Sequence, residues 1–294
     1  MQGFVFLSQQ LGPGRRVLVE APTYDRPLKI LAGLGAEIVT VAMDDEGLDP
    51  DALEQALDAG EPPAFLYTIP TFQNPSGRTL STERRRRLVE LARERDLLVL
   101  EDDPYGLVRF EGEPPPTLYE LEGGDHTVYS SSFSKTIAPG LRVGWFVLPA
   151  PLAAQLEAVA VSTYISPPYL PQATVYEFVE RGRFEPNIER VAGLLRPRRD
   201  AMLAALEREF PDGAHWSTPE GDYFLWLDLP ESLDAGELLE RSTAAGVTFV
   251  KGADFFPAGS GEGRSALRLA YSFASPAEIE SGIGTLAELL PAAV

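Results

Sequence analysis

A single lysine, Lys135, stands among small hydroxyl residues in the stretch Ser131-Ser-Phe-Ser-Lys-Thr-Ile-Ala-Pro-Gly-Leu-Arg142. Apolar runs at residues 126–129 and 142–148 predict strands on either side, so the lysine falls on a short connection between two buried strands. Connections at strand ends are where α/β enzymes place their chemistry. Most loop lysines are simply solvated, and the rest of the chain has to decide between these two interpretations.

Three further polar loops each follow an apolar run: Glu20–Tyr24, Pro70–Gly77 and Glu101–Tyr105. In an open parallel sheet such loops converge at the carboxyl ends of the strands, where ligands bind. With the lysine loop they would assemble a lysine, an aspartate, an asparagine, two tyrosines, several serines and an arginine. This set contains neither a metal cage nor a Ser-His-Asp arrangement. It suits a flat, anionic, nitrogen-containing cofactor that is held by a lysine.

The elements that must position these loops alternate between strand and helix. The patterns predict strands over residues 17–20, 37–41, 64–68 and 97–100, and helices over 28–34, from 50 onward, and 81–95. Such alternation with nearly continuous apolar strands is typical of an α/β fold. We therefore expect a mainly parallel sheet sandwiched by helices.

The pattern changes from about residue 149, where helices follow one another. A smaller C-terminal α+β domain is expected, with the large domain over 1–190 and the small domain over 191–294. The final helix opens with a capping box formed by Ser275 and Glu278. The other expected elements are helices over 150–166, 168–182, 186–210 (interrupted or kinked near Pro197) and 234–244, and strands over 223–229, 247–250 and 266–270.

Composition excludes several classes of function. The 294 residues carry a net charge of −19, which disfavours nucleic acid and anionic membrane surfaces as direct partners. The chain has no cysteine and only two histidines, so thiolate chemistry is excluded and no metal site is expected. No apolar run approaches the ~18 residues of a membrane span, and no signal peptide is visible. A cytoplasmic enzyme is the expectation.

Three motifs carry a resemblance to a known family: Ser132-Phe-Ser-Lys-Thr-Ile-Ala-Pro-Gly-Leu-Arg142, Gln73-Asn-Pro-Ser-Gly77 and Glu101-Asp-Asp-Pro-Tyr105. Through them the chain resembles, over essentially its whole length, the fold-type I, class I and II aminotransferases that depend on pyridoxal 5′-phosphate. Within that family it is similar to the kynurenine and 2-aminoadipate aminotransferases and to the aminotransferase-like domains of MocR-type regulators.

The resemblance implies a role for each loop residue. Lys135 would form the Schiff base with the cofactor aldehyde, and Asp102 would keep the pyridine nitrogen protonated. Asn74 and Tyr105 would hydrogen-bond the phenolic oxygen. Judged from the residues alone, Asp102 could be a cap or turn residue and Asn74 part of an Asn-Pro turn. Asp103 is the weaker candidate for the contact with the nitrogen.

The same resemblance assigns the remaining contacts. Tyr24 would stack on the cofactor ring, although its residue type also suits a half-buried aromatic beside a loop. Arg268 would clamp the α-carboxylate of the substrate in its planar fork. Four residues complete the cofactor-binding set, mainly around the phosphate group: Gln2, Ser132, Ser134 and Arg142.

The chain departs from the family pattern in three places. Met1 and Gln2 stand for the end of the family's Gly-Ser-X-Gln motif, so we expect a truncated form that lacks the first strand and the N-terminal arm. Gly221-Asp-Tyr-Phe replaces the commoner Gly-Gly-Met/Phe-Phe, which would alter the substrate pocket. Lys251-Gly replaces Pro-Gly, and Lys251 and Asp254 are expected to face solvent.

The expected function is therefore an aminotransferase that moves an amino group from an L-amino acid to a 2-oxo acid, in a homodimer. The alternatives are a ligand-sensing domain of a MocR-type regulator, a truncated inactive homologue, and a lyase or decarboxylase with the same cofactor. Aromatic residues Tyr24, Tyr105 and Tyr223 favour large apolar or aromatic amino donors.

Overall fold

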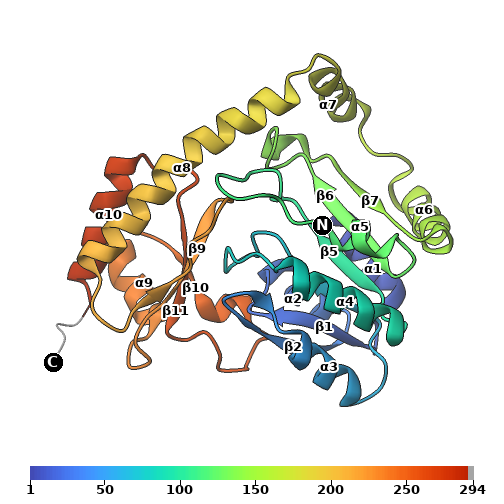
Figure 1. The fold of residues 1–294 in the computed structure, drawn as a ribbon, viewed down its shortest axis with the longest axis horizontal. Coiled ribbons are helices and arrows are strands. Elements are labelled where there is room, and N and C mark those ends of the chain that lie inside the picture. Colours follow the sequence, from blue (N-terminus) through green and yellow to red (C-terminus); the bar gives the residue numbers. More distant parts are fainter. Residues whose placement is uncertain (291–294) are drawn as a thin grey trace.

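A computed structural model describes residues 1–290 of the chain. Its strands form one seven-stranded and one four-stranded sheet. Figure 1 shows the two sheets beside one another, with the long helix α8 (Phe184–Glu209) running from the larger half of the molecule to the smaller one. Within these 290 residues, none of the helices combines the length and apolar character that a bilayer-spanning segment requires.

The larger sheet has the strand order β3-β2-β1-β4-β5-β6-β7. Its four central pairings are parallel, whereas the edge strands β3 and β7 pair in the antiparallel sense. The predicted mainly parallel α/β sheet is therefore confirmed. Its strands are β1 (Arg16–Ala21), β2 (Glu37–Asp44), β3 (Gly47–Leu48), β4 (Phe65–Thr68), β5 (Val99–Asp102), β6 (Thr127–Ser132) and β7 (Gly144–Val147).

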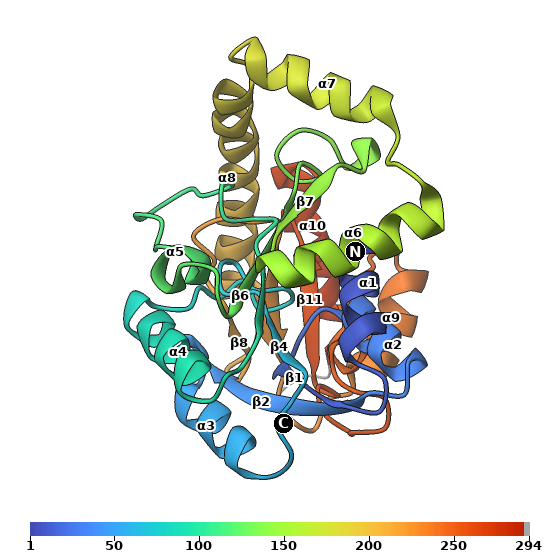
Figure 2. The same cartoon turned by 90° about the vertical axis from the view of Figure 1, so that its right-hand side faces the viewer.

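Helices cover both faces of this sheet because the buried strands are apolar on both sides. In β1, Val17 and Val19 pack with the helices of one face, whereas Leu18 packs with those of the other. Figure 2 shows the two layers on opposite sides of the sheet. One layer contains α1 (Gln2–Leu11), α2 (Asp25–Gly33) and α6 (Ala150–Tyr164), and the other contains α3 (Pro50–Asp58), α4 (Thr82–Glu94) and α5 (Leu118–Glu122).

The smaller sheet is antiparallel throughout and has the order β10-β11-β9-β8. Its core joins Leu227 and Leu267 from the strands with Leu206 and Ile283 from the helices. Its strands are β8 (His215–Trp216), β9 (Phe224–Asp228), β10 (Val250–Lys251) and β11 (Ala266–Ala270). The remaining helices of the chain are α7 (Tyr169–Glu180), α9 (Ala235–Ala244), α10 (Pro276–Glu288) and the short 3-10 helices η1 (Pro139–Leu141) and η2 (Gly252–Phe255).

Most predicted elements are present, and the capping box of α10 is confirmed by reciprocal hydrogen bonds between Ser275 and Glu278. Many of the expected bounds shift by a few residues. The strand expected over 247–250 is replaced by the short β10, Val250–Lys251, and the strand expected from residue 142 begins at Gly144, because Arg142 has a left-handed φ of 53°. The interruption expected near Pro197 is wrong, because helix α8 continues through this residue and packs against α10.

Candidate active site

The four predicted loops all follow the carboxyl ends of parallel strands, as the sheet order requires. Tyr24 follows β1, Asn74 follows β4, Asp102 ends β5, and Lys135 follows β6. These strands are neighbours in the order β1-β4-β5-β6, and so their loops lie along one edge of the sheet. Arg268 comes from β11 of the smaller sheet and meets them across the space between the two sheets.

Lys135 is partly buried between aromatic rings. Its Nζ atom lies 5.5 Å from the ring centroid of Tyr105 and 5.3 Å from that of Tyr223. The hydroxyl of Tyr223 donates a hydrogen bond to the backbone carbonyl of Lys135, which fixes the loop against the segment that leads into β9. Burial lowers the pKa of the Lys135 amine, and a lowered pKa favours the neutral, nucleophilic form.

Asp102 is held by two hydroxyl groups of the neighbouring strands. Its carboxylate accepts hydrogen bonds from Tyr67 at 2.9 Å and from Ser130 at 3.1 Å. Burial raises the pKa of Asp102, while these two hydrogen bonds act in the opposite direction. Asp103 is engaged elsewhere, since its carboxylate accepts from Tyr129 at 3.0 Å. Among the described residues, Asp102 therefore bonds hydroxyl groups of both β4 and β6, whereas Asp103 bonds one hydroxyl of β6.

The guanidinium of Arg268 is placed to bind an anion. It donates a hydrogen bond of 2.8 Å to the side-chain oxygen of Asn74, and its Cζ lies 4.5 Å and 5.0 Å from the ring centroids of Phe224 and Phe255. Its Nε is buried and has no hydrogen-bond partner among the described residues. A buried donor without an acceptor is costly, and a carboxylate bound here would supply the missing acceptor.

A second group of donors lies around the loop of Lys135. Arg142 donates to the hydroxyl of Ser134 at 3.3 Å, and the Ser134 amide donates to the Ser132 hydroxyl at 3.4 Å. Arg142 keeps a left-handed backbone, with φ of 53°, a conformation that is rare for a residue with a side chain. Gln2 is the exposed first residue of α1, and within residues 1–290 it forms no hydrogen bond to these three side chains.

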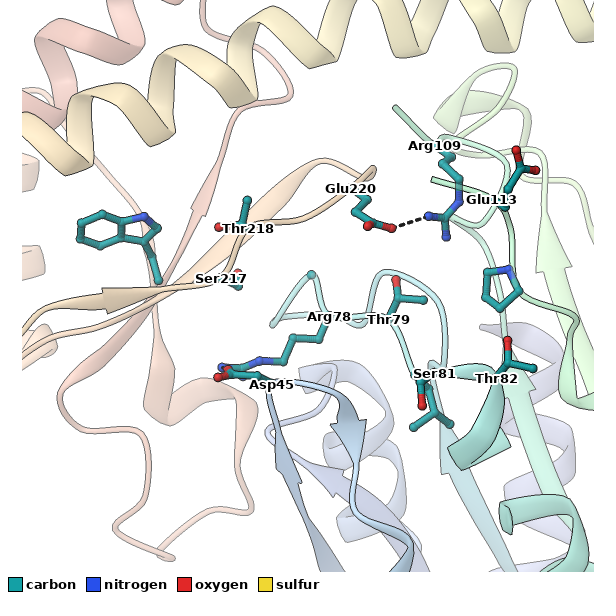
Figure 3. A pocket seen from close by; sticks show the side chains of 14 residues that line it. Asp45, Arg78, Thr79, Ser81, Thr82, Arg109, Glu113, Ser217, Thr218 and Glu220 are labelled. Carbon is teal, nitrogen blue, oxygen red and sulfur yellow. Dashed lines mark hydrogen bonds and ion pairs between the residues drawn. The ribbon is translucent and has the colours of Figure 1, made fainter. Parts of the chain in front are cut away.

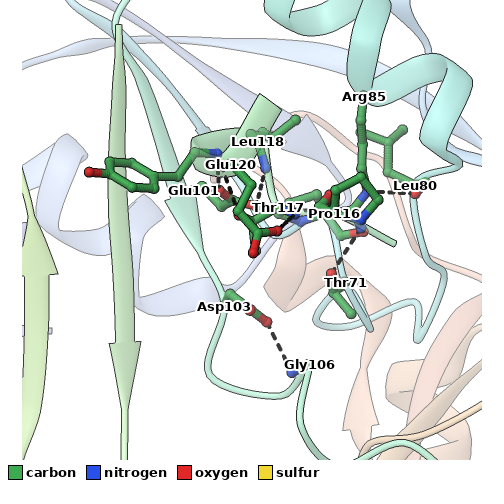
Figure 4. A network of polar contacts seen from close by, with 12 residues as sticks. Thr71, Leu80, Arg85, Glu101, Asp103, Gly106, Pro116, Thr117, Leu118 and Glu120 are labelled. Atoms are coloured by element: carbon green, nitrogen blue, oxygen red, sulfur yellow. Dashed lines mark hydrogen bonds and ion pairs between the residues drawn. The ribbon is translucent and has the colours of Figure 1, made fainter. Parts of the chain in front are cut away.

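Two buried charged residues hold the loops beneath the site (Figure 4). Arg85 of α4 donates to the carbonyl of Pro70 at 2.6 Å and to the hydroxyl of Thr71 at 2.8 Å. Glu101 accepts from the amides of Leu118 and Tyr119, each at 2.9 Å. The segment that leads to Asn74 and the strand that ends in Asp102 are thereby fixed by groups that the sequence analysis did not single out.

A separate cavity of about 550 Å³ lies between the sheets, away from these residues (Figure 3). Arg78 pairs there with Asp45 and Arg109 with Glu220, each at 2.7 Å. Within residues 1–290, Nε and Nη2 of Arg109 are buried and have no hydrogen-bond partner. None of the predicted site residues lines it.

Sequence reasoning missed three residues of the site. Tyr67 and Ser130 lie inside strands, and only the pairing of β4, β5 and β6 brings them to Asp102. Asp222 was visible as a departure from the family motif, but it was given no role. It is fully buried, and burial raises the pKa of its carboxyl group, whereas the charges of Lys135 and Arg268 act in the opposite direction.

Comparisons with known proteins identify the family. The family model "Aminotransferase class I and II" matches residues 2–285. The chain is 37% identical to aromatic-amino-acid aminotransferase 1 of Thermococcus litoralis, over 95% of this chain and 68% of that protein. It is 33% identical to the uncharacterised helix-turn-helix-type transcriptional regulator YisV of Bacillus subtilis, over 92% of this chain and 55% of that one.

Among solved structures, the α-aminoadipate aminotransferase of Thermus thermophilus, complexed with N-(5′-phosphopyridoxyl)-L-leucine, superimposes with a TM-score of 0.92 at 36% identity. The alignment covers 98% of this chain and 74% of that one. The expected family, activity and cofactor are thus confirmed. The chain belongs to the class I and II aminotransferases and is a pyridoxal 5′-phosphate-dependent aminotransferase.

Proposed function

We propose that Lys135, Asp102, Asn74, Tyr105 and Arg268 carry the transfer of an amino group from an L-amino acid to a 2-oxo acid. The observation that supports this proposal best is the meeting of Arg268 and Asn74 at 2.8 Å, beside the strand ends that hold the other three residues. The residues fit the cofactor, because a partly buried amine, a carboxylate and an arginine–serine cluster lie along one edge of the sheet. When bound, pyridoxal phosphate supplies a ring that takes up the electron pair of the substrate's Cα–H bond.

The chain's own groups then have separate tasks. The amine of Lys135 would attach the cofactor and afterwards move the proton at Cα of the substrate. Asp102 would face the ring nitrogen with its carboxylate, and Asn74 and Tyr105 would face the ring's phenolic oxygen. Arg268 would bind the α-carboxylate through the edge that carries its unpartnered Nε, which orients the substrate.

The remaining cofactor contacts follow from the second cluster. Arg142 and Ser134, which are already 3.3 Å apart, would bind the phosphate group together with Ser132. Gln2 at the start of α1 remains part of the proposed set, with the least support from the geometry. Tyr24 would cover one face of the ring, and its place directly after β1, at the same sheet edge as the other loops, supports this role.

The proposed amino donors have large apolar or aromatic side chains. Tyr24, Tyr105 and Tyr223 supply aromatic surface around Lys135 and Arg268. The relative from Thermococcus litoralis is named for aromatic amino acids, and the Thermus thermophilus structure holds a leucine adduct. A panel of L-amino acids, compared by kcat/KM, would test this choice; a preference for small or acidic donors would contradict it.

A spectroscopic titration tests the roles of the residues. The purified chain is supplied with pyridoxal phosphate, and the visible absorbance is followed as candidate amino acids are added. Conversion to the pyridoxamine form, reversed by 2-oxoglutarate, is the expected result. Lys135→Ala should abolish this half-reaction, and turnover retained in that variant would refute the assignment.

We also propose a homodimer, supported by apolar side chains that α6, α7 and their connection leave in solvent. Ile165, Tyr169 and Leu170 are 82%, 82% and 77% exposed, and an apolar patch of this kind marks an interaction surface. The domain boundary is proposed near residue 190, within α8, since each sheet has its own core. A cytoplasmic location and a part in biosynthetic amino acid metabolism are also proposed, and cell fractionation and growth tests would check them.

A further inference from the structure

Tyr223 lies where two cores of the molecule meet. It directly precedes β9, and its side chain packs against both the core beside the smaller sheet and one core of the larger sheet. Its ring centroid is 5.3 Å from Nζ of Lys135, and its hydroxyl donates a hydrogen bond to the backbone carbonyl of the same lysine. One side chain thus contacts both the amine and the backbone of Lys135.

The backbone around Lys135 obtains its hydrogen bonds from side chains of distant elements. The lysine lies in a turn after β6, outside any helix or strand. Among residues 1–290, its carbonyl accepts no hydrogen bond other than that of Tyr223. The next carbonyl, of Thr136, accepts from the side chain of Asn187 in the first turn of α8, at 2.6 Å. The place of Lys135 is therefore set from outside its own strand.

Tyr223 is in turn joined to β11, the strand that carries Arg268. Its carbonyl accepts a hydrogen bond from the amide of Tyr271 at 3.0 Å. From there the antiparallel pairing of β9 and β11 continues to Trp226, which lies opposite Arg268. A continuous path of hydrogen bonds thus runs from the backbone of Lys135 to the strand of the arginine.

This path constrains the reacting amine. In the proposed transfer, the amine of Lys135 first attaches the cofactor and then moves a proton at Cα of a substrate that Arg268 holds by its carboxylate. With the lysine carbonyl fixed, Nζ moves by rotation of its own side chain about an anchored backbone. Such an anchor keeps the amine within reach of Cα, and positioning of this kind contributes directly to rate.

We propose that Tyr223 is a positioning residue for the amino-group transfer, because its hydroxyl holds the backbone of Lys135 at a fixed place relative to Arg268. The inference rests on the proposed roles of these two residues. It gives a task to a departure from the family pattern, since the commoner methionine or phenylalanine has no hydroxyl to donate. A purely structural role would instead mean that only the packing of the ring matters.

The first test removes the hydroxyl and keeps the ring, in Tyr223→Phe. Lys135-Thr136 is the only Lys-Thr pair in the sequence. A cofactor-free chain labelled with 13C at the lysine carbonyls and with 15N in threonine therefore gives a single carbonyl-to-amide NMR correlation. Loss of the hydrogen bond should move the Lys135 carbonyl signal upfield in this variant.

Steady-state kinetics of the cofactor-loaded protein supply a second readout. Tyr223→Phe should lower kcat about 5-fold, the contribution of one hydrogen bond, because Lys135 acts after the substrate has bound. The KM for the amino acid should change by less than about 2-fold, because Arg268 keeps its own contacts. A loss of packing alone would not separate kcat from KM in this way.

Tyr271→Phe is the matched control. It removes a hydrogen bond of the same kind, from a tyrosine hydroxyl to the carbonyl of Gly221 at 2.7 Å. Gly221 stays in place without this bond, because backbone hydrogen bonds join the residues on both sides of it to Val108 and Phe110. The Lys135 carbonyl signal and kcat should therefore remain as in the wild type.

Three outcomes would overturn the proposal: a Lys135 carbonyl signal that Tyr223→Phe does not move, a kcat in that variant no lower than in Tyr271→Phe, or a KM that rises as much as kcat falls. The NMR measurement needs neither cofactor nor turnover. Failure of the proposed amino-group transfer would appear as a wild type without conversion in the absorbance titration, and the two failures are therefore distinguishable.

Discussion

The guanidinium of Arg268 donates a 2.8 Å hydrogen bond to the side-chain oxygen of Asn74, although the two residues are 194 positions apart. The contact joins the small antiparallel sheet to the carboxyl end of β4. Amino acids and 2-oxo acids share the α-carboxylate, so an arginine fixed in this way would act on both halves of the reaction.

Arg268→Lys is predicted to raise KM for both the amino acid and the 2-oxo acid. Lysine retains the charge but loses the planar fork. A charge-assisted hydrogen bond contributes about 1.5–3 kcal/mol, so KM should rise roughly 10- to 100-fold. The control is Arg264→Lys, since the Arg264 side chain is 77% exposed and pairs with Asp234. Steady-state kinetics of both variants measure KM for each substrate. A similar change in KM in both variants would contradict the assignment.

Tyr67→Phe is predicted to move the acid side of the pH–rate profile to higher pH. The lost 2.9 Å hydrogen bond holds the pKa of Asp102 down, so its carboxylate would protonate at higher pH as the medium is acidified. One such bond contributes about 1 kcal/mol, and kcat near neutral pH should fall several-fold. Tyr129→Phe is the matched control, because that hydroxyl bonds Asp103. Equal shifts in the two variants would show that the effect does not pass through Asp102.

The sequence was sufficient for those parts of the site that are encoded by neighbouring residues. The strand-end positions of Lys135 and Asp102 follow from apolar runs that are followed by polar loops, and the sheet order then brings those loops together. The position of Arg268 on β11 could also be read from its apolar neighbours. The resemblance to a family added the roles, which the residue pattern alone left open.

Partners that meet through strand register could not be predicted. Tyr67 lies 35 positions before Asp102 and reaches it only because β4 pairs with β5 in one register. The strand expected over 247–250 is not formed as such, because Val247 and Phe249 pack into the core beside the smaller sheet without pairing in that sheet. The left-handed backbone of Arg142 could not be predicted either, because glycine is the residue that usually indicates this conformation and position 142 is an arginine.

Glu20→Gln is predicted to flatten the pH dependence of stability. Burial raises the pKa of Glu20 from 4.5 to about 7. A carboxyl group with a raised folded-state pKa contributes stability at low pH and loses it as pH rises from about 4.5 to about 7. At about 1.4 kcal/mol per pKa unit, the upper limit is about 3 kcal/mol.

Glutamine can replace the acid without losing its contacts. Its amide oxygen can accept from Ile69 and Gln73, and its amide nitrogen can donate to Thr68. Urea unfolding of both proteins at pH 5 and pH 8 measures the effect. The wild type should lose stability relative to the variant at the higher pH, and parallel curves would refute the burial argument.

Leu170→Glu is predicted to dissociate the proposed dimer. Leu170 is 77% exposed in the single chain, and a charge inside an apolar interface has no partner. Leu194→Glu is the control, because Leu194 is 50% exposed but lies on α8. Sedimentation equilibrium should show a monomer for the first variant and a dimer for the second. A monomeric wild type would contradict the proposed interface.

Gly221→Ala is predicted to destabilise the protein, although the change adds only one methyl group. A Cβ at this position would overlap the ring of Phe72 and the backbone carbonyl oxygen of Val108. The carbonyl is held by the amide of Asp222 at 3.0 Å and cannot move away freely, so we expect the free energy of unfolding to fall by about 1–3 kcal/mol.

Gly193→Ala is the matched control: nothing lies within 4 Å of its Cβ, and alanine in α8 should stabilise the protein by about 0.5–1 kcal/mol. Opposite shifts in Tm by calorimetry are expected. An unchanged Tm in Gly221→Ala would mean that the segment before Asp222 is not held against Val108 as tightly as its hydrogen bonds indicate.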